Sequence, residues 1–489
     1  MPFDSPQPDG PATVKFPHRS RRGVLLGLSA PQLVATTITG LLLLAVLMAS
    51  GVAGALKLIP LWALILSAVF VRHRGRSLAD WTPIALRYTW RRSKRQLVWL
   101  TRPSSRPRRD GLLHLPGTAA SLRVVTSPDG RLSAVHDPHN GTLTAVVKVS
   151  SRAFALLDPS AQNHNVAGWG RTLAALARTG HIARVQVLER TVPDSGDSLN
   201  RYWGAYGNPQ AHLAGPVYAD LLTAAGPAAA PHESYVALAL DLKAGRRLIN
   251  QAGGGLTGSF AVLTQLTSTF DQAARTSGLT PGGWLLATEI AAVIRTAYDP
   301  KALAALDQWS ATGRPQADPA AAGPVVLVEK ADRIETDSAH HATFWIENWP
   351  RIETSPGFLH QLLFTSGVRR TLSLTYEPKG LNAALKDVQR KKATVIADAA
   401  ERQRKGQVDS EEDSVEYADI KERERQLIAG HADVALTGLV TVSADTAEQL
   451  NSACAAIETA AVAALVDLRP LTWQQAEAFT NAALPLARP

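Results

Sequence analysis

The longest run of apolar positions in the chain lies near its start. Between Gly23 and Val71 the only charged residue is Lys57. A membrane-spanning helix needs about 20 predominantly apolar residues, so this run is long enough for two spans joined by a tight turn. The pattern predicts a helical hairpin with spans near Leu33–Ala53 and Leu56–Val71.

After this run, apolar residues recur with a period of two in short segments and of 3.6 in longer ones. Short alternating segments separated by Asp-Gly and Asn-Gly pairs predict antiparallel strands, and the longer amphipathic segments predict helices. The predicted strands are Leu122–Val125, Leu132–His136, Leu143–Val149, Ala183–Glu189, Tyr235–Asp241, Val325–Glu329, Thr343–Glu347, Thr371–Tyr376, Val434–Val442 and Val466–Arg469. The predicted helices are Gln162–Arg178, Thr257–Arg275, Pro281–Ala297, Leu381–Arg404, Tyr417–Ile428, one that begins with a capping box of Asp445 and Glu448, and Trp473–Leu484.

The predicted fold class is α+β, with an N-terminal two-helix transmembrane hairpin and a cytosolic body of antiparallel sheets with packed helices. The strand–helix–strand–helix order near the end predicts a ferredoxin-like C-terminal part. The charged arm Leu381–Ile428 is either an interaction element or a helical hairpin that packs only on itself. The predicted parts are a basic tail (1–22), the hairpin (23–71), a basic juxtamembrane segment and linker (72–110), a first α+β domain (111–232), a second α+β or helical block (233–366) and the C-terminal block with its arm (367–489).

The charge is distributed unevenly along the chain. The net charge is +9, but residues 1–109 carry +14 and residues 110–489 carry −5. A nucleic-acid groove requires its basic residues on the folded body, so we expect no direct sequence-specific contact with nucleic acid. Positive charge on both flanks of the hairpin predicts a two-span protein of the cytoplasmic membrane with both termini in the cytoplasm.

The segment after the hairpin mixes aromatic and basic residues, including Trp81, Tyr88 and Trp90. This composition suits the headgroup layer of a bilayer with anionic lipid, although a helix that caps the cytosolic domain is the alternative. The candidate residues for contact with anionic lipid are Arg72, Arg74, Arg76, Arg87, Arg91, Arg92, Lys94 and Arg95.

Little in the sequence favours catalysis. No G-x-x-x-x-G-K-[ST] motif occurs, which argues against P-loop ATP hydrolysis. The G-x-G-x-x-G of Gly253–Gly258 does not directly follow a strand, as a dinucleotide site requires, and we interpret it as a turn. His136–His139 is read as a turn, His340 and His341 point to opposite faces of a strand, and Cys454 belongs to an apolar helix face. We therefore predict a protein that is not an enzyme, with no catalytic residues, cofactor or metal.

Several short motifs, taken in order, carry a resemblance. They are Arg74–Ser77, Gly168–Gly170, Val192–Gly196, Arg295–Pro300, Arg369–Tyr376, Gln475–Phe479 and Leu484–Leu486. With them, the chain resembles the actinobacterial integral membrane proteins encoded in conjugative elements. Its hairpin resembles the small two-span inner-membrane subunit of type IV secretion, and its soluble part is similar to the non-motor N-terminal region of the conjugation ATPase.

The resemblance implies a non-catalytic inner-membrane scaffold of a conjugative, type IV-like secretion machine. Such a subunit anchors and docks a separate ATPase, contacts other secretion-channel subunits and belongs to an oligomeric assembly. Two alternatives remain open: a core membrane component of the type VII (ESX) apparatus, and a membrane-tethered nucleotide-using enzyme.

Overall fold

The computed structural model describes residues 13–14, 16, 30–73, 76–101, 111–151, 154–192, 203–208, 211, 214–225, 232–312, 317–404, 411–429 and 431–488. The chain divides into two compact units. The first, called the body, comprises Met1–Phe16, Trp99–Leu471 and Gln475–Pro489. The second, called the N-terminal unit, comprises Pro17–Val98 together with the short segment Thr472–Gln474.

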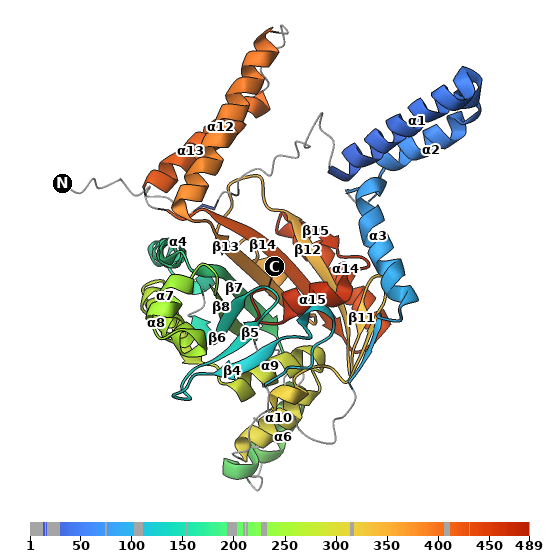
Figure 1. Ribbon diagram of the computed structural model, residues 1–489. Helices are drawn as coiled ribbons and strands as arrows, with labels where there is room; N and C mark the ends of the chain where they lie inside the picture. The colour runs from blue at the N-terminus through green and yellow to red at the C-terminus, as the bar shows by residue number, and fades with distance from the viewer. Residues whose placement is uncertain are drawn as a thin grey trace, which may run out of the picture. The chain divides into compact units, whose positions relative to one another are not determined.

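A 13-stranded sheet organises the body (Figure 1). The strand order is β3-β10-β11-β12-β14-β13-β7-β8-β6-β5-β4, with β15 pairing with β12 and β9 with β6. The strands are β3 (Val98–Leu100), β4 (Arg123–Thr126), β5 (Ser133–Asp137), β6 (Thr142–Ser151), β7 (Ile182–Thr191), β8 (His232–Asp241), β9 (Leu279–Trp284), β10 (Val326–Glu329), β11 (Ile334–Glu335), β12 (His340–Asn348), β13 (Arg369–Pro378), β14 (Val434–Ala444) and β15 (Asp467–Pro470).

Helices cover both faces of this sheet (Figure 1). The described helices of the body are α4 (Pro159–Thr179), α6 (Ala214–Ala225), α7 (Arg246–Gln251), α8 (Gly255–Thr276), α9 (Ala287–Tyr298), α10 (Ala302–Ala311), α11 (His360–Leu363), α12 (Leu381–Arg404), α13 (Glu411–Ile428), α14 (Ala447–Ala463) and α15 (Gln475–Ala483). Of these, α12 and α13 form an arm that extends away from the sheet (Figure 1).

Strand β8 shows why the sheet needs helices on both sides. Its Val236, Leu238 and Leu240 belong to a core with residues of α4 and α8. Its Tyr235 and Ala237 belong to the opposite core, which includes residues of α9 and α15. Side chains alternate between the two faces of a strand. A strand with apolar residues at both its odd-numbered and its even-numbered positions is therefore buried on both faces. A third core joins α14 to β12 and β14.

The α+β class and the antiparallel sheet agree with the sequence prediction. The predicted boundaries after residues 232 and 366 do not interrupt the sheet, because β8 pairs with β6 and β7, and β13 pairs with both β14 and β7. The strands at the end of the chain therefore belong to the same sheet as those of the predicted first domain.

Three local predictions were wrong. Pro281 lies in strand β9 and not at a helix start, and α9 begins only at Ala287. The N-cap of α14 is Thr446, whose hydroxyl accepts a hydrogen bond from the Gln449 N–H, so Asp445 does not form the predicted cap.

The third wrong prediction concerns the break in the arm. Helix α13 begins at Glu411, six residues before its predicted start at Tyr417. Acidic residues are favourable in a first helical turn because they face the positive end of the helix dipole.

The N-terminal unit contains α1 (Ala30–Lys57), α2 (Ile59–Phe70), the two-residue strands β1 (Arg72–His73) and β2 (Arg76–Ser77), and α3 (Leu78–Ser93). One described helix, Gln32–Lys57, is long and apolar enough to cross a membrane. Helix α2 has 12 residues, or about 18 Å, which is shorter than a bilayer core. The backbone of α1 departs from helical geometry at Gly51 (φ 65°, ψ −169°).

Candidate membrane-facing site

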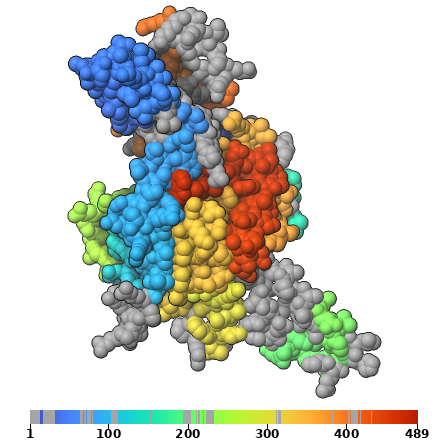
Figure 2. Space-filling model, turned by 90° about the vertical axis from the view of Figure 1, so that its right-hand side faces the viewer, coloured from blue at the N-terminus to red at the C-terminus, as the bar shows by residue number. Residues whose placement is uncertain are grey.

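Helix α1 exposes the side chains that a soluble helix would bury. Leu41, Leu44 and Met48 are 62%, 54% and 84% exposed. The most apolar stretch of the helix has no buried residue, and Figure 2 shows its side chains (dark blue) uncovered on the face in view. A contiguous apolar surface of this kind marks a membrane or protein contact.

Helix α3 follows within the same unit and begins with a well-formed cap. The Ser77 hydroxyl accepts a hydrogen bond from the Asp80 N–H at 3.2 Å and donates one to the Asp80 carboxylate at 2.8 Å. Arg91 and Arg92 lie in the last turn, where cations interact favourably with the helix dipole. The sequence therefore sets both ends of α3 locally.

The outer surface of α3 carries an apolar row beside a basic row. Leu86 and Trp90, one turn apart, are 68% and 58% exposed. Arg87 directly follows Leu86 in the sequence, and Arg91 directly follows Trp90. The basic row therefore lies about 100° around the helix from the apolar row. Arg92 follows Trp90 by two positions and lies on the opposite side. Exposed apolar and aromatic residues beside guanidinium groups are typical of helices that bind a bilayer interface.

Another face of α3 is covered by an aromatic residue that the sequence prediction misplaced. The Trp473 ring packs edge-to-face on Trp81, with centroids 5.5 Å apart, and lies 6.2 Å from Tyr88. The sequence predicted that Trp473 begins the last helix. Instead, Trp473 has a left-handed backbone (φ 65°) and lies two residues before α15 begins at Gln475. No local pattern in the sequence pointed to this partner.

The structure brings most of the predicted lipid-contacting residues to α3 and its flanks. Arg72 and Arg76 belong to the paired strands β1 and β2, and Arg74 lies outside the described residues. Arg87 and Arg92 are exposed on α3, and Arg91 is half-buried there. Lys94 and Arg95 follow the helix and are exposed.

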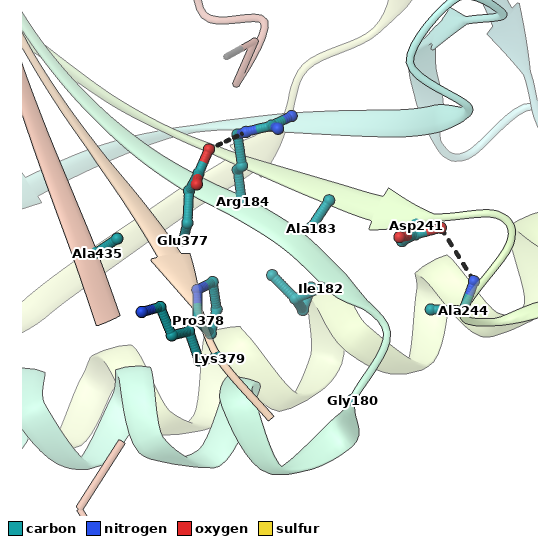
Figure 3. Close-up of a pocket in the computed structure, with 10 residues that line it drawn as sticks. All are labelled: Gly180, Ile182, Ala183, Arg184, Asp241, Ala244, Glu377, Pro378, Lys379 and Ala435. Atoms are coloured by element: carbon teal, nitrogen blue, oxygen red, sulfur yellow. Dashed lines mark hydrogen bonds and ion pairs between the residues drawn. The ribbon is translucent and has the colours of Figure 1, made fainter. Parts of the chain in front are cut away.

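The body contains a pocket of about 370 Å³ where β7 and β13 separate (Figure 3). The two strands pair up to Tyr376 and Val185. Beyond that point, the Arg184 guanidinium bridges the gap to the Glu377 carboxylate at 2.6 Å. Asp241 accepts hydrogen bonds from the Lys243 and Ala244 N–H groups. These three charged groups of the pocket therefore bind one another or the backbone.

The predicted turn at His136–His139 is explained by a structural carboxylate. Asp137 accepts hydrogen bonds from the His139 and Asn140 N–H groups and from the Arg488 guanidinium at 2.9 Å. Burial acts to raise the pKa of Asp137, but the bonds from Asn140 and the charge of Arg488 hold it below its usual value. The carboxylate therefore anchors the C-terminal segment to the sheet.

His340 and His341 face opposite sides of β12, as predicted. His341 is fully buried and lies within hydrogen-bond distance of the Thr336 and Ser443 hydroxyls. Burial lowers its pKa to about 3, so the imidazole is neutral. His340 lies 3.4 Å from the Glu335 carboxylate. Among the described residues, no three His, Cys, Asp or Glu side chains gather as metal ligands would.

Cys454 and the glycine motif are also explained by packing. Cys454 lies half-buried against the α14 core, and burial raises its pKa to about 12, which leaves the thiol unreactive. A Cβ atom on Gly258 would lie 2.2 Å from the Ile249 carbonyl oxygen. This glycine thus permits close packing of α7 on α8.

Comparisons with known proteins give no relative to set beside these observations: no protein-family model matches the chain, and no curated protein matches it.

Proposed function

We propose that this protein is a non-catalytic inner-membrane scaffold of a conjugative, type IV-like secretion machine, and that it docks a separate ATPase. The observation that carries the proposal is the apolar surface of α1, followed in the same unit by the basic α3. An anchor and a charged interfacial helix are the parts that a membrane scaffold needs.

The proposal includes two crossings of the bilayer. The non-helical backbone at Gly51 divides the apolar run into residues 30–50 and residues 52–70. Helix α2 alone is too short for a span, so the second crossing requires residues 52–57 together with α2. Basic residues follow the second stretch, including Arg72 and Arg76. Arg21 and Arg22 precede the first stretch. Under the positive-inside rule, basic residues on both flanks support a cytoplasmic position for both ends of the hairpin.

The body supports a docking role by its construction. Its sheet is covered by helices on both faces, and its pocket contains charged groups that bind one another. The sequence contains no Walker motif, so the energy for transport is supplied by another polypeptide. We expect that ATPase and other channel subunits to bind the body.

Membrane fractionation with cross-linking tests the proposal. The full chain, expressed with the neighbouring genes of its own genome, is expected to stay in the membrane pellet after an alkaline carbonate wash. In-cell cross-linking followed by mass spectrometry is expected to join peptides of the body to a hexameric ATPase. A variant lacking residues 30–71 is the control for the anchor and is expected in the supernatant.

Three results would contradict the proposal. Recovery of the full chain in the soluble fraction removes the anchor. Cross-links to channel proteins of a type VII apparatus would assign the body to that machine. Turnover of nucleoside triphosphates by the purified chain would contradict the non-catalytic role.

A further inference from the structure

The arm formed by α12 and α13 has a small core of its own. Its buried residues are Ala384, Val388, Val395, Ile420 and Leu427, separate from the three cores of the body. The two helices run antiparallel, side by side (Figure 1), and Lys392 bonds Glu424 across them at 2.8 Å. Two helices that bury so few side chains leave most of their surface available for a partner.

Ion pairs fix the end of the arm that joins the sheet. Arg423 lies 2.5 Å from Asp433 and 3.3 Å from Asp387. Lys379, which leads into α12, and Lys391 each lie 3.8 Å from Asp387. The arm is therefore held as a defined hairpin at its root, which lowers the conformational entropy lost on binding.

The arm is electrically polarised along its length. Its root half, residues 381–392 and 420–428, carries a net charge of +4. Its tip half, residues 393–404 and 411–419, carries −5. Two arms packed in parallel would place like charges together, whereas two arms packed antiparallel would place each root beside the tip of the other.

An exposed apolar patch begins at mid-length, where the root half ends, and extends into the tip half. On α12, Ile396 is 53% exposed, and the small residues Ala393, Ala397 and Ala400 are exposed on the side opposite the buried Val395. On α13, Val415 is 50% exposed. Small residues let a second helix approach closely, and an exposed isoleucine supplies apolar area for burial.

We propose that the arm is a self-association surface, and that two copies of this chain pair their arms antiparallel about a two-fold axis near Ile396. A two-fold interface is self-complementary: if a first residue of one copy contacts a second residue of the other copy, the same contact is made again with the two copies exchanged. The antiparallel order joins the positive root to the negative tip twice and buries the mid-length patch of both copies. This inference does not depend on the secretion role.

Cysteine cross-linking on the full chain in detergent tests the orientation. The background variant is Cys454→Ala, and Gln389→Cys and Arg404→Cys are made separately because both positions are exposed on the face of α12 that carries the patch. A mixture of the two variants is expected to form a disulfide-linked dimer of one copy of each. Gln389→Cys alone is expected to give none, because an antiparallel pair keeps the two Gln389 positions apart.

Sedimentation of unmodified and substituted chains tests the contact itself. Ile396→Glu is expected to dissociate the dimer. Lys386→Glu is expected to weaken the association of the two copies about tenfold. Each substitution occurs twice in the dimer, once in each copy, which enlarges its effect. Val462→Glu, at a 73% exposed site on α14, is the matched control and is expected to leave the dimer intact. Circular dichroism checks that the arm stays helical in each variant.

Each remaining outcome overturns the inference. A Gln389→Cys homodimer indicates parallel arms, and a monomer at micromolar concentration indicates no pairing. Dissociation by Val462→Glu as much as by Ile396→Glu places the contact elsewhere. Because membrane anchoring is measured by fractionation, a failure of arm pairing is distinguishable from a failure of the proposed function.

Discussion

The body and the N-terminal unit use basic residues in opposite ways. In the body, Arg488 and Asp137 form an ion pair in which both side chains are about 95% buried, and Arg190 pairs with Glu233 at 2.7 Å. In residues 72–109, twelve Lys and Arg residues are opposed by Asp80 alone. The two ion pairs in the body hold its fold together. The cations of residues 72–109 outnumber the carboxylates of the same segment by twelve to one, a composition that favours contact with anions.

The apolar residues of the two regions differ in the same sense. Strand β8 is buried on both faces, while α1 exposes leucines to the surroundings. Apolar burial stabilises by about 25 cal/mol per Å², so α1 gains stability only when a bilayer or another protein covers it. The predictions below test whether each region depends on the environment assigned to it.

The largest effect is expected in the body, from Arg488→Met. The substitution leaves the Asp137 carboxylate buried without its cation, and breaking a buried pair costs about 3–5 kcal/mol. Urea unfolding of the full chain in detergent, followed by tryptophan fluorescence, measures this loss. Arg425→Met is the matched control, since the Arg425 side chain is 73% exposed and such pairs contribute about 0–1 kcal/mol. Equal losses for the two variants would show that burial does not distinguish these arginines.

The next effect is expected in the N-terminal unit, from Leu44→Arg. An arginine at the centre of a spanning helix costs about 2.5–3.5 kcal/mol, so a smaller fraction of the chain should resist carbonate extraction. Val462→Arg makes the same charge change on the body and should leave the extracted fraction unchanged. Full resistance of the Leu44→Arg chain would mean that α1 does not cross the bilayer.

A third prediction concerns the pH dependence of the body. The pKa of His341 is about 3 in the folded chain and about 6.5 when unfolded. The unfolded state therefore binds the extra proton below pH 6.5, and stability falls by about 1.4 kcal/mol per pH unit from there toward pH 3. The unfolding free energy should decrease between pH 6.5 and pH 5, and this decrease should be about 2 kcal/mol smaller in His341→Gln than in the unmodified chain. An unchanged slope would indicate that folding does not lower the pKa of His341.

Local elements could be predicted well from the sequence because their patterns are local. Helix α12 has the predicted bounds, Leu381–Arg404, and β13 extends the predicted strand by two residues at each end. Strand partners could not be predicted, because alternation assigns residues to faces and carries no information about the neighbouring strand. The pairing of β13 with β7 joins residues nearly 190 positions apart.

The candidate site could be predicted only in part, for the same reason. The cations of α3 follow from composition, and their exposure from the amphipathic pattern. Trp473 was assigned to a helix because its neighbours continue a helical pattern. Its contact with Trp81 joins residues nearly 400 positions apart, and no local pattern encodes such a contact.

The smallest effect is expected on α3 itself, from Arg87→Gln. One cation near an anionic surface contributes about 1 kcal/mol, so binding to phosphatidylserine vesicles should weaken about fivefold at low salt, with less difference at high salt. Arg92→Gln removes the same charge from the side of α3 away from Leu86 and Trp90, and it should weaken binding less. Vesicle flotation of a chain lacking residues 30–71 measures α3 without the contribution of α1. If the two substitutions have equal effects, the basic row has no fixed orientation toward the lipid and acts only through its net charge.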